Sequence, residues 1–184
     1  TDTGPEMESP FFIIGTERSG SNLLRLILDS HSRIAVPHPP HLVRYFSKIQ
    51  ENYGDISQSI NFQKLCRDVQ ALLQTHIHPW EVDLNWEEVE QKSNPKDIFG
   101  IQYQLYQQYT QTKGKIRWGC KSTFHIVNVP RLAQDWPLAR FLFLVRDPRD
   151  VVASSMRSVF SPSHPVFAAE LWRDQQSLGL RWEQ

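Results

Sequence analysis

The sequence has few cysteines, no long apolar run and no net charge, and each shortage excludes a class of protein. Its two cysteines, Cys66 and Cys120, are too few for a disulfide framework, and the spacings typical of zinc ligands are missing. No apolar run approaches the roughly 20 residues of a membrane-spanning helix. Basic and acidic residues balance at 20 each without Lys/Arg runs, which disfavours nucleic acid as a partner. These absences predict a cytoplasmic protein or, alternatively, a lumenal domain excised from its membrane anchor.

What the sequence does contain is typical of a globular protein. Hydrophobic residues make up 40% and charged residues 22% of the 184 positions, enough for one domain with its own core. The polar residues 1–9 predict a disordered tail, and we expect residues 10–184 to form a single domain. The last helical pattern reaches Gln184 without a stop signal, so this domain is expected to lack its C-terminal part.

Short apolar runs alternate with amphipathic helical patterns along the domain. The continuous apolar runs at 10–14 and 140–145 predict strands buried on both faces, because a half-exposed strand would alternate. Residues 115–120 predict a third strand. Helices are predicted at 21–30, 55–78, 95–112, 124–135, 147–158 and 165–182. The alternation predicts the α/β class, with a P-loop-like parallel sheet flanked by helices on both faces.

The first predicted strand leads into a glycine-rich turn. Gly15 and Gly20 have the G-x-x-x-x-G spacing of a phosphate-binding loop, whose backbone N–H groups surround an anion at a helix N-terminus. A nucleoside-triphosphate loop would continue with Lys and Ser/Thr, which neutralise the phosphates and hold Mg²⁺. Here Ser21 and Asn22 occupy those positions, and the fixed positive charge is that of Arg18. The loop is therefore expected to bind an anion other than Mg-ATP.

A second candidate anion site follows the strand predicted at 140–145. Arg146 ends this strand, at the edge of the sheet where α/β proteins bind ligands. Asp147 and Pro148 start the next helix, and Ser154 lies two turns along it on the same face as Asp147. Arg146 and Ser154 are therefore predicted to converge on one tetrahedral anion.

In their order and spacing, these segments resemble the sulfotransferases that use 3′-phosphoadenosine 5′-phosphosulfate (PAPS). Residues 18–23 (RSGSNL) match the family's 5′-phosphosulfate loop, and Arg146 with Ser154 match its 3′-phosphate segment. Residues 118–122 (WGCKS) resemble the strand end whose lysine approaches the transferred group. The Arg-Ser-Gly start is nearer to the bacterial and Golgi-type branches than to the cytosolic phenol branch. The donor-binding residues implied are Arg18, Ser19, Gly20, Ser21, Asn22, Arg146 and Ser154.

The resemblance implies an enzyme that transfers a sulfuryl group in line from PAPS to an acceptor. The acceptor would be a hydroxyl (or an amine) on a small molecule, a glycan or a lipid. A transferring sulfuryl group carries less charge than a γ-phosphoryl group, so no metal is expected, in agreement with the missing Mg²⁺ ligand. Catalysis would depend on positioning, on electrostatic support of the bridging oxygen and on a base for the acceptor.

The resemblance also implies catalytic residues. Lys121 is the lysine expected near the transferred group. Many relatives place a glutamate base in the loop after the first helix, where this chain has none; His41 and His38 are the local substitutes. His125 matches a recurrent family histidine, and a base outside the chain is a fourth possibility.

Other interpretations stay open at this stage. One alternative is a P-loop kinase or NTPase, which the replaced Lys-Ser/Thr pair disfavours. Another is a non-catalytic fragment with the sulfotransferase fold, favoured by the missing glutamate. Trp80 and Trp86, in an acidic linker-like stretch, belong either to the core or to an acceptor pocket.

Overall fold

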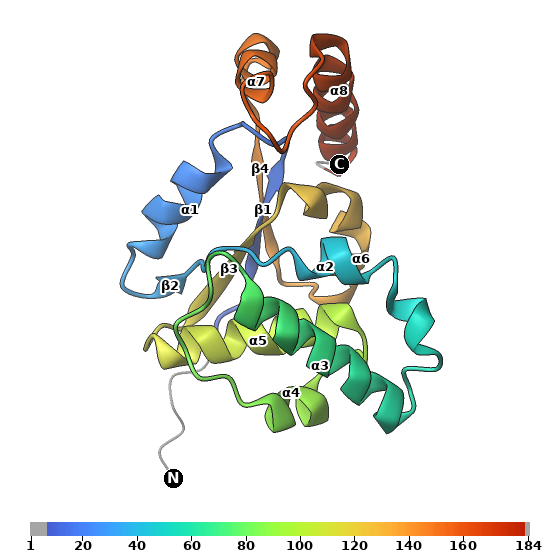
Figure 1. The fold of residues 1–184 in the computed structure, drawn as a ribbon. Coiled ribbons are helices and arrows are strands. Elements are labelled where there is room, and N and C mark those ends of the chain that lie inside the picture. The colour runs from blue at the N-terminus through green and yellow to red at the C-terminus, as the bar shows by residue number, and fades with distance from the viewer. Residues whose placement is uncertain (1–6, 183–184) are drawn as a thin grey trace. The chain divides into compact units, whose positions relative to one another are not determined.

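The computed structural model describes residues 7–182, whose contacts divide into two compact units. Of the described residues, unit 1 contains residues 7–8 and Ser32–Trp118; unit 2 contains Ser9–His31 and the chain from Gly119 onward. Figure 1 shows the elements of both units by label and colour. The chain passes from unit 1 to unit 2 inside strand β3 (Arg117–Lys121), so this one strand belongs to both.

The strands form a parallel sheet of order β2-β3-β1-β4. In unit 2, β1 (Phe11–Gly15) pairs along its full length with β4 (Arg140–Leu144) and with the last residues of β3. In unit 1, β2 (Ile34–Ala35) pairs with the first residues of β3. All three pairings are parallel, which confirms the predicted α/β class and parallel sheet.

The core of unit 2 is built on β1, all five residues of which are buried. Figure 1 shows helix α1 (Ser21–Asp29) beside one face of β1 and helix α8 (Pro165–Arg181) beside the other. A 3₁₀ turn, η2 (Thr123–Asn128), and α6 (Val129–Asp135) replace the single helix predicted at 124–135. Helix α7 (Pro148–Ser155) follows β4 and is three residues shorter at its C-terminal end than predicted.

Strand β4 corrects one prediction. Its residues 140–144 form the expected parallel strand, but they are half-buried or exposed, and Leu142 is 39% exposed. The continuous apolar run predicted burial on both faces, as is found for β1. β4 is the last strand in the described sheet order, so among residues 7–182 it has a strand neighbour on one side only. The continuous apolar run in the sequence therefore predicts the strand correctly, but it does not predict how deeply the strand is buried.

Unit 1 is helical apart from its strand residues. Helix α3 (Ser59–Thr75) buries one apolar stripe, formed by Phe62, Leu65, Val69 and Leu73. Helix α5 (Ile98–Thr112) is capped by Asp97, whose carboxylate accepts hydrogen bonds from the N–H groups of Phe99 and Gly100. Trp118 is buried against the rings of Tyr103 and Tyr106 of α5.

Three short helical elements of unit 1 escaped sequence analysis. They are α2 (Leu42–Phe46), the 3₁₀ turn η1 (Gln50–Tyr53) and α4 (Trp86–Lys92). The stretch that resembled an acidic linker is helical because Asn85 caps it, accepting a hydrogen bond from Glu88 N–H at 3.1 Å. Two acidic residues in the first turn of α4 stabilise the positive end of its dipole.

The N-terminal segment was predicted to be a disordered tail over residues 1–9. Residues 1–6 lie outside the described part of the chain. Glu8 donates its N–H to Ile116 O at 2.8 Å and forms an ion pair with Arg33 at 2.5 Å.

No helix within residues 7–182 is long and apolar enough to cross a membrane.

Candidate functional site

Two residues of the loop between β1 and α1 adopt the left-handed backbone conformation. Arg18 has a φ of 67° and Gly20 a φ of 90°, a conformation that glycine adopts easily and arginine rarely. Strain of this kind persists where the surroundings enforce it, and it gathers at binding sites. Gly20 precedes α1, and no side chain of the described residues caps this helix. The first N–H groups of α1 are therefore available to an anion.

The second predicted anion segment begins at the end of β4. Asp147 caps α7 by accepting a hydrogen bond from Arg149 N–H at 2.9 Å. The same carboxylate accepts two hydrogen bonds from the Arg149 side chain, at 3.0 and 2.7 Å. These bonds lower the pKa of Asp147 to about 2. Asp147 and Arg149 thus hold the start of α7, leaving Arg146 and Ser154 to face the first loop.

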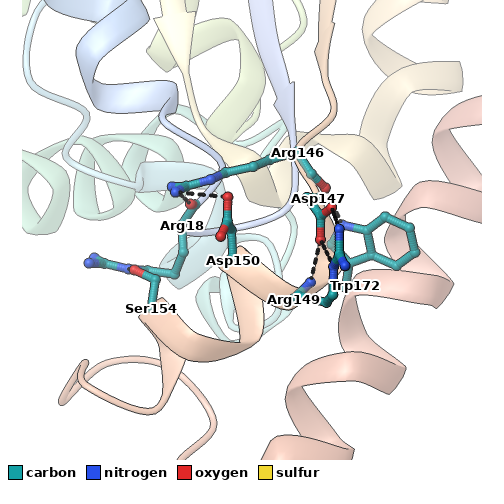
Figure 2. A network of polar contacts seen from close by, with 7 residues as sticks. All are labelled: Arg18, Arg146, Asp147, Arg149, Asp150, Ser154 and Trp172. Carbon is teal, nitrogen blue, oxygen red and sulfur yellow. Dashed lines mark hydrogen bonds and ion pairs between the residues drawn. The ribbon is translucent and has the colours of Figure 1, made fainter.

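The two anion segments meet in space, as Figure 2 shows. Arg18 Nε donates a hydrogen bond to Ser154 Oγ at 3.0 Å. Arg146 Nη1 donates to the carbonyl oxygen of Arg18 at 3.1 Å, and its Nη2 lies 3.5 Å from a carboxylate oxygen of Asp150. Residues that are 128 and 136 positions apart in the sequence are therefore in direct contact.

A pocket of about 250 Å³ lies where these segments meet. Six of the seven predicted donor-binding residues line it, together with Leu23; they are Arg18, Gly20, Ser21, Asn22, Arg146 and Ser154. The seventh, Ser19, lies in the same loop with 7% of its surface exposed. Its hydroxyl is buried and has no hydrogen-bond partner among residues 7–182. The pocket thus combines two guanidinium groups, hydroxyls and a helix N-terminus, a set suited to phosphate groups.

Arg25 supports this pocket and was not singled out from the sequence. It is 8% exposed, and its Nε donates to Asn22 Oδ1 at 3.0 Å. The bond orients the Asn22 side chain, which lines the pocket. The signal for Arg25 was a single charge inside the otherwise apolar pattern NLLRLIL.

Lys121 lies at the carboxyl end of β3, paired in register with Ile13 of β1. Burial lowers the pKa of its ammonium group, and the positive charges of Arg25 and Arg18 lower it further, while Glu17 opposes them. Arg18 also lines the pocket, so the charge of Lys121 interacts with a residue of the pocket wall. A half-buried lysine with a lowered pKa is a better proton donor than an exposed one.

The three histidines proposed as bases lie in different surroundings. His125, in unit 2, is 1% exposed and packs edge-on against the Phe12 ring, with centroids 5.6 Å apart. His41, in unit 1, precedes α2 with a φ of 54°. His38, also in unit 1, lies beside His78, with ring centroids 4.2 Å apart. None of the three lines the pocket between the anion segments.

Trp80 and Trp86, candidates for an acceptor pocket, line one pocket of about 280 Å³ in unit 1. The indole of Trp80 donates a hydrogen bond to His38 O at 2.8 Å and packs edge-on against Tyr106. The aromatic walls suit the apolar face of an organic molecule.

In the described part of the chain, no group of three or more His, Cys, Asp or Glu side chains could hold a metal ion.

Comparison with known proteins identifies the family of this chain. The sequence profile of the Sulfotransferase family matches residues 10–184. The chain belongs to the sulfotransferase family. Among solved structures, this sulfotransferase chain is similar to the "Sulfotransferase Domain from the Curacin Biosynthetic Pathway", with a TM-score of 0.58 and 20% identity.

That similarity extends over 96% of this chain and 63% of the curacin domain, so the chain spans less than two thirds of its length. At this level of identity the likeness shows a shared fold. No curated protein sequence matches the sulfotransferase chain significantly.

Proposed function

We propose that this chain binds PAPS between its two anion segments and transfers the sulfuryl group to a hydroxyl or amine acceptor without a metal. One observation carries the proposal: Arg18 of the first segment and Ser154 of the second are hydrogen-bonded at 3.0 Å beside one pocket. PAPS is anionic at two separate places, its 5′-phosphosulfate and its 3′-phosphate. A single pocket served by two anion segments suits such a ligand.

Each segment has its own part in this proposal. The 5′ group is held by the N-terminus of α1 and by residues 18–22, where the buried Ser19 hydroxyl is without a partner among the described residues. The 3′-phosphate is held by Arg146 and Ser154. Arg18 uses Nε for Ser154, so its two terminal nitrogens remain to form a fork around a phosphate.

Lys121 is proposed to support the reaction itself. PAPS, when bound, supplies the sulfuryl group and a leaving phosphate whose bridging oxygen gains charge as the S–O bond breaks. The Lys121 ammonium donates a hydrogen bond to that oxygen, and its lowered pKa favours the donation. Its place at the end of β3 puts it on the rim where parallel sheets bind ligands.

A base must remove the acceptor proton; the candidates are His41, then His38 and His125, or a base outside this chain. His125 is 1% exposed, so an acceptor would reach it only after η2 moved. Neutral imidazole accepts a proton near pH 7, which suits the deprotonation of a hydroxyl or an ammonium group.

Titration calorimetry of the chain with 3′-phosphoadenosine 5′-phosphate (PAP), with Mg²⁺ and with EDTA, tests the donor site. We expect PAP to bind equally well in both buffers and more tightly than 5′-AMP or ATP. A requirement for Mg²⁺, or a preference for ATP, would overturn the proposal in favour of a kinase or NTPase. Transfer of labelled sulfate from PAPS to a panel of hydroxyl and amine acceptors then tests catalysis, and PAP binding without transfer would indicate a non-catalytic member of the family.

A further inference from the structure

Helix α8 holds both anion segments by side chains on one of its faces. Trp172 Nε1 donates a hydrogen bond to Arg146 O at 3.0 Å, as Figure 2 shows. Gln176, one helical turn further on, donates from Nε2 to Thr16 Oγ1 at 2.8 Å. Thr16 follows β1 directly and begins the first anion loop, while Arg146 begins the second. Each bond thus ends where a strand passes into an anion segment.

The helix is itself closely packed on the sheet. Gly179 lies against the Phe143 ring of β4, and a Cβ atom at this position would be 2.3 Å from Phe143 Cζ. Glycine at this position lets α8 approach the Phe143 ring closely, and a larger side chain would force the ring to move. Helix α8 therefore packs directly on a side chain of β4.

Stability alone does not account for the amide of Gln176. Its side chain is 5% exposed and Thr16 is 2% exposed, so the hydrogen bond between them is buried. Gln176 Oε1 is buried as well and has no partner among residues 7–182. A buried carbonyl oxygen without a partner costs free energy that an apolar side chain of the same size would avoid. The amide is explained if its N–H group is needed to hold Thr16.

We propose that Trp172 and Gln176 are positioning residues that set the separation of the two anion segments, and so fit the pocket to a nucleotide with two separated phosphate groups. This inference rests on the proposed function. The two residues act on different segments, since Gln176 holds the 5′ loop through Thr16 and Trp172 holds the 3′ segment through Arg146. Their removal should therefore affect different parts of the ligand.

Three variants of the full chain test this division, with dissociation constants for PAP and 5′-AMP measured by titration calorimetry. Trp172→Phe keeps an aromatic ring, though a smaller one, and removes the N–H; it should weaken PAP about fivefold to tenfold while leaving 5′-AMP within about twofold. Gln176→Leu should weaken both nucleotides about equally, by about fivefold, because both carry the 5′-phosphate. Trp182→Phe is the matched control: it removes an indole hydrogen bond to Ile126 O from the residue that directly follows α8, and should change neither constant.

Melting temperatures of all three variants separate positioning from general stability. A merely structural role would lower the melting temperature without changing the dissociation constants of the folded chain, whereas a positioning role weakens binding well below that temperature. For Trp172→Phe, the ratio of the two dissociation constants is a second readout. If Gln176→Leu folds poorly, Thr16→Val removes the same bond from its other end and should reproduce its binding losses. Equal weakening of PAP and 5′-AMP by Trp172→Phe, or behaviour of Trp172→Phe and Gln176→Leu like that of the Trp182→Phe control, would overturn this inference alone. Failure of the unaltered chain to bind PAP would overturn the proposed function and this inference with it.

Discussion

Arg18 and Ser154 are 136 positions apart in the sequence, yet Arg18 Nε donates a hydrogen bond to Ser154 Oγ at 3.0 Å. The bond joins the loop after β1 to the helix after β4. It forms because β1 and β4 are parallel neighbours, so that both segments leave the sheet at the same edge. Two anion sites that are separate in the sequence thus become one pocket.

Replacement of Arg146 should separate the two phosphate sites. Arg146→Ala is expected to weaken PAP by about tenfold to hundredfold, on the order of 1.5–3 kcal/mol, because one charge-assisted hydrogen bond is lost. Binding of 5′-AMP, which has no 3′-phosphate, should change little. Arg149→Ala, which removes a guanidinium paired with Asp147 instead, serves as the control. Equal losses for both nucleotides in Arg146→Ala would remove the assignment of Arg146 to the 3′-phosphate.

Lys121 should matter for turnover more than for binding. Lys121→Ala is expected to lower kcat by about 10²–10³ with little change in PAP affinity, because charge on the bridging oxygen develops only in the transition state. Lys121→Arg, which keeps a positive donor, should retain part of the rate. The check is kcat with labelled PAPS beside the Kd for PAP. Unchanged kcat in Lys121→Ala would show that the lysine is only a charge at a strand end.

The same lysine should reduce stability at neutral pH. Burial lowers its pKa, so the folded chain binds this proton less tightly than the unfolded chain does. The resulting loss of folding stability is fully present below the pKa that Lys121 has in the folded chain. It disappears as the pH rises from that value to the pKa of the unfolded chain, near 10.5. Lys121→Met should therefore raise the melting temperature at pH 7, and the gain should shrink toward pH 10.5. Lys64→Met, at an exposed position of α3, controls for the loss of a positive charge.

Asp147 should make the start of α7 sensitive to acid. Its hydrogen bonds with Arg149 depress its pKa to about 2, below the unfolded value of about 3.9. Its contribution is thus present above about pH 4 and is lost as the pH falls toward 2. Asp147→Ala should lower the melting temperature at pH 7, and the difference from the unaltered chain should close in this acid range. Asp147→Asn keeps a capping oxygen, so its melting temperature at pH 7 should fall less than that of Asp147→Ala. Equal melting temperatures for the unaltered chain, Asp147→Asn and Asp147→Ala would contradict the role of the cap.

The pH profile of kcat should identify the base. A catalytic imidazole gives a rate that rises with pH through about 6.5. His41→Ala and His38→Ala, measured separately, are expected to differ, and only the variant without the base should lose this rise. If both keep the profile and the rate of the unaltered chain, His125→Ala is the next variant to measure.

Local sequence carried most of the information about unit 2. The run FFIIG predicted β1, the Gly15–Gly20 frame predicted the turn before α1, and Asp147-Pro148 predicted the start of α7. These signals are strong because each depends on neighbouring residues: a continuous apolar run, a left-handed turn or a helix cap. In unit 1 the local signals were weaker, and α2 and α4 are too short for their periodicity to stand out.

The sequence by itself determined the fold class and the seven residues expected at the donor site, because strand runs, turns and caps are local and the family motifs are contiguous. Only the tertiary structure decided that β4 is partly exposed, that Arg18 contacts Ser154, and that Trp172 and Gln176 hold the two anion segments. Each of these depends on which strands are neighbours and on where α8 packs. Such contacts join positions far apart in the sequence, and no local pattern records them.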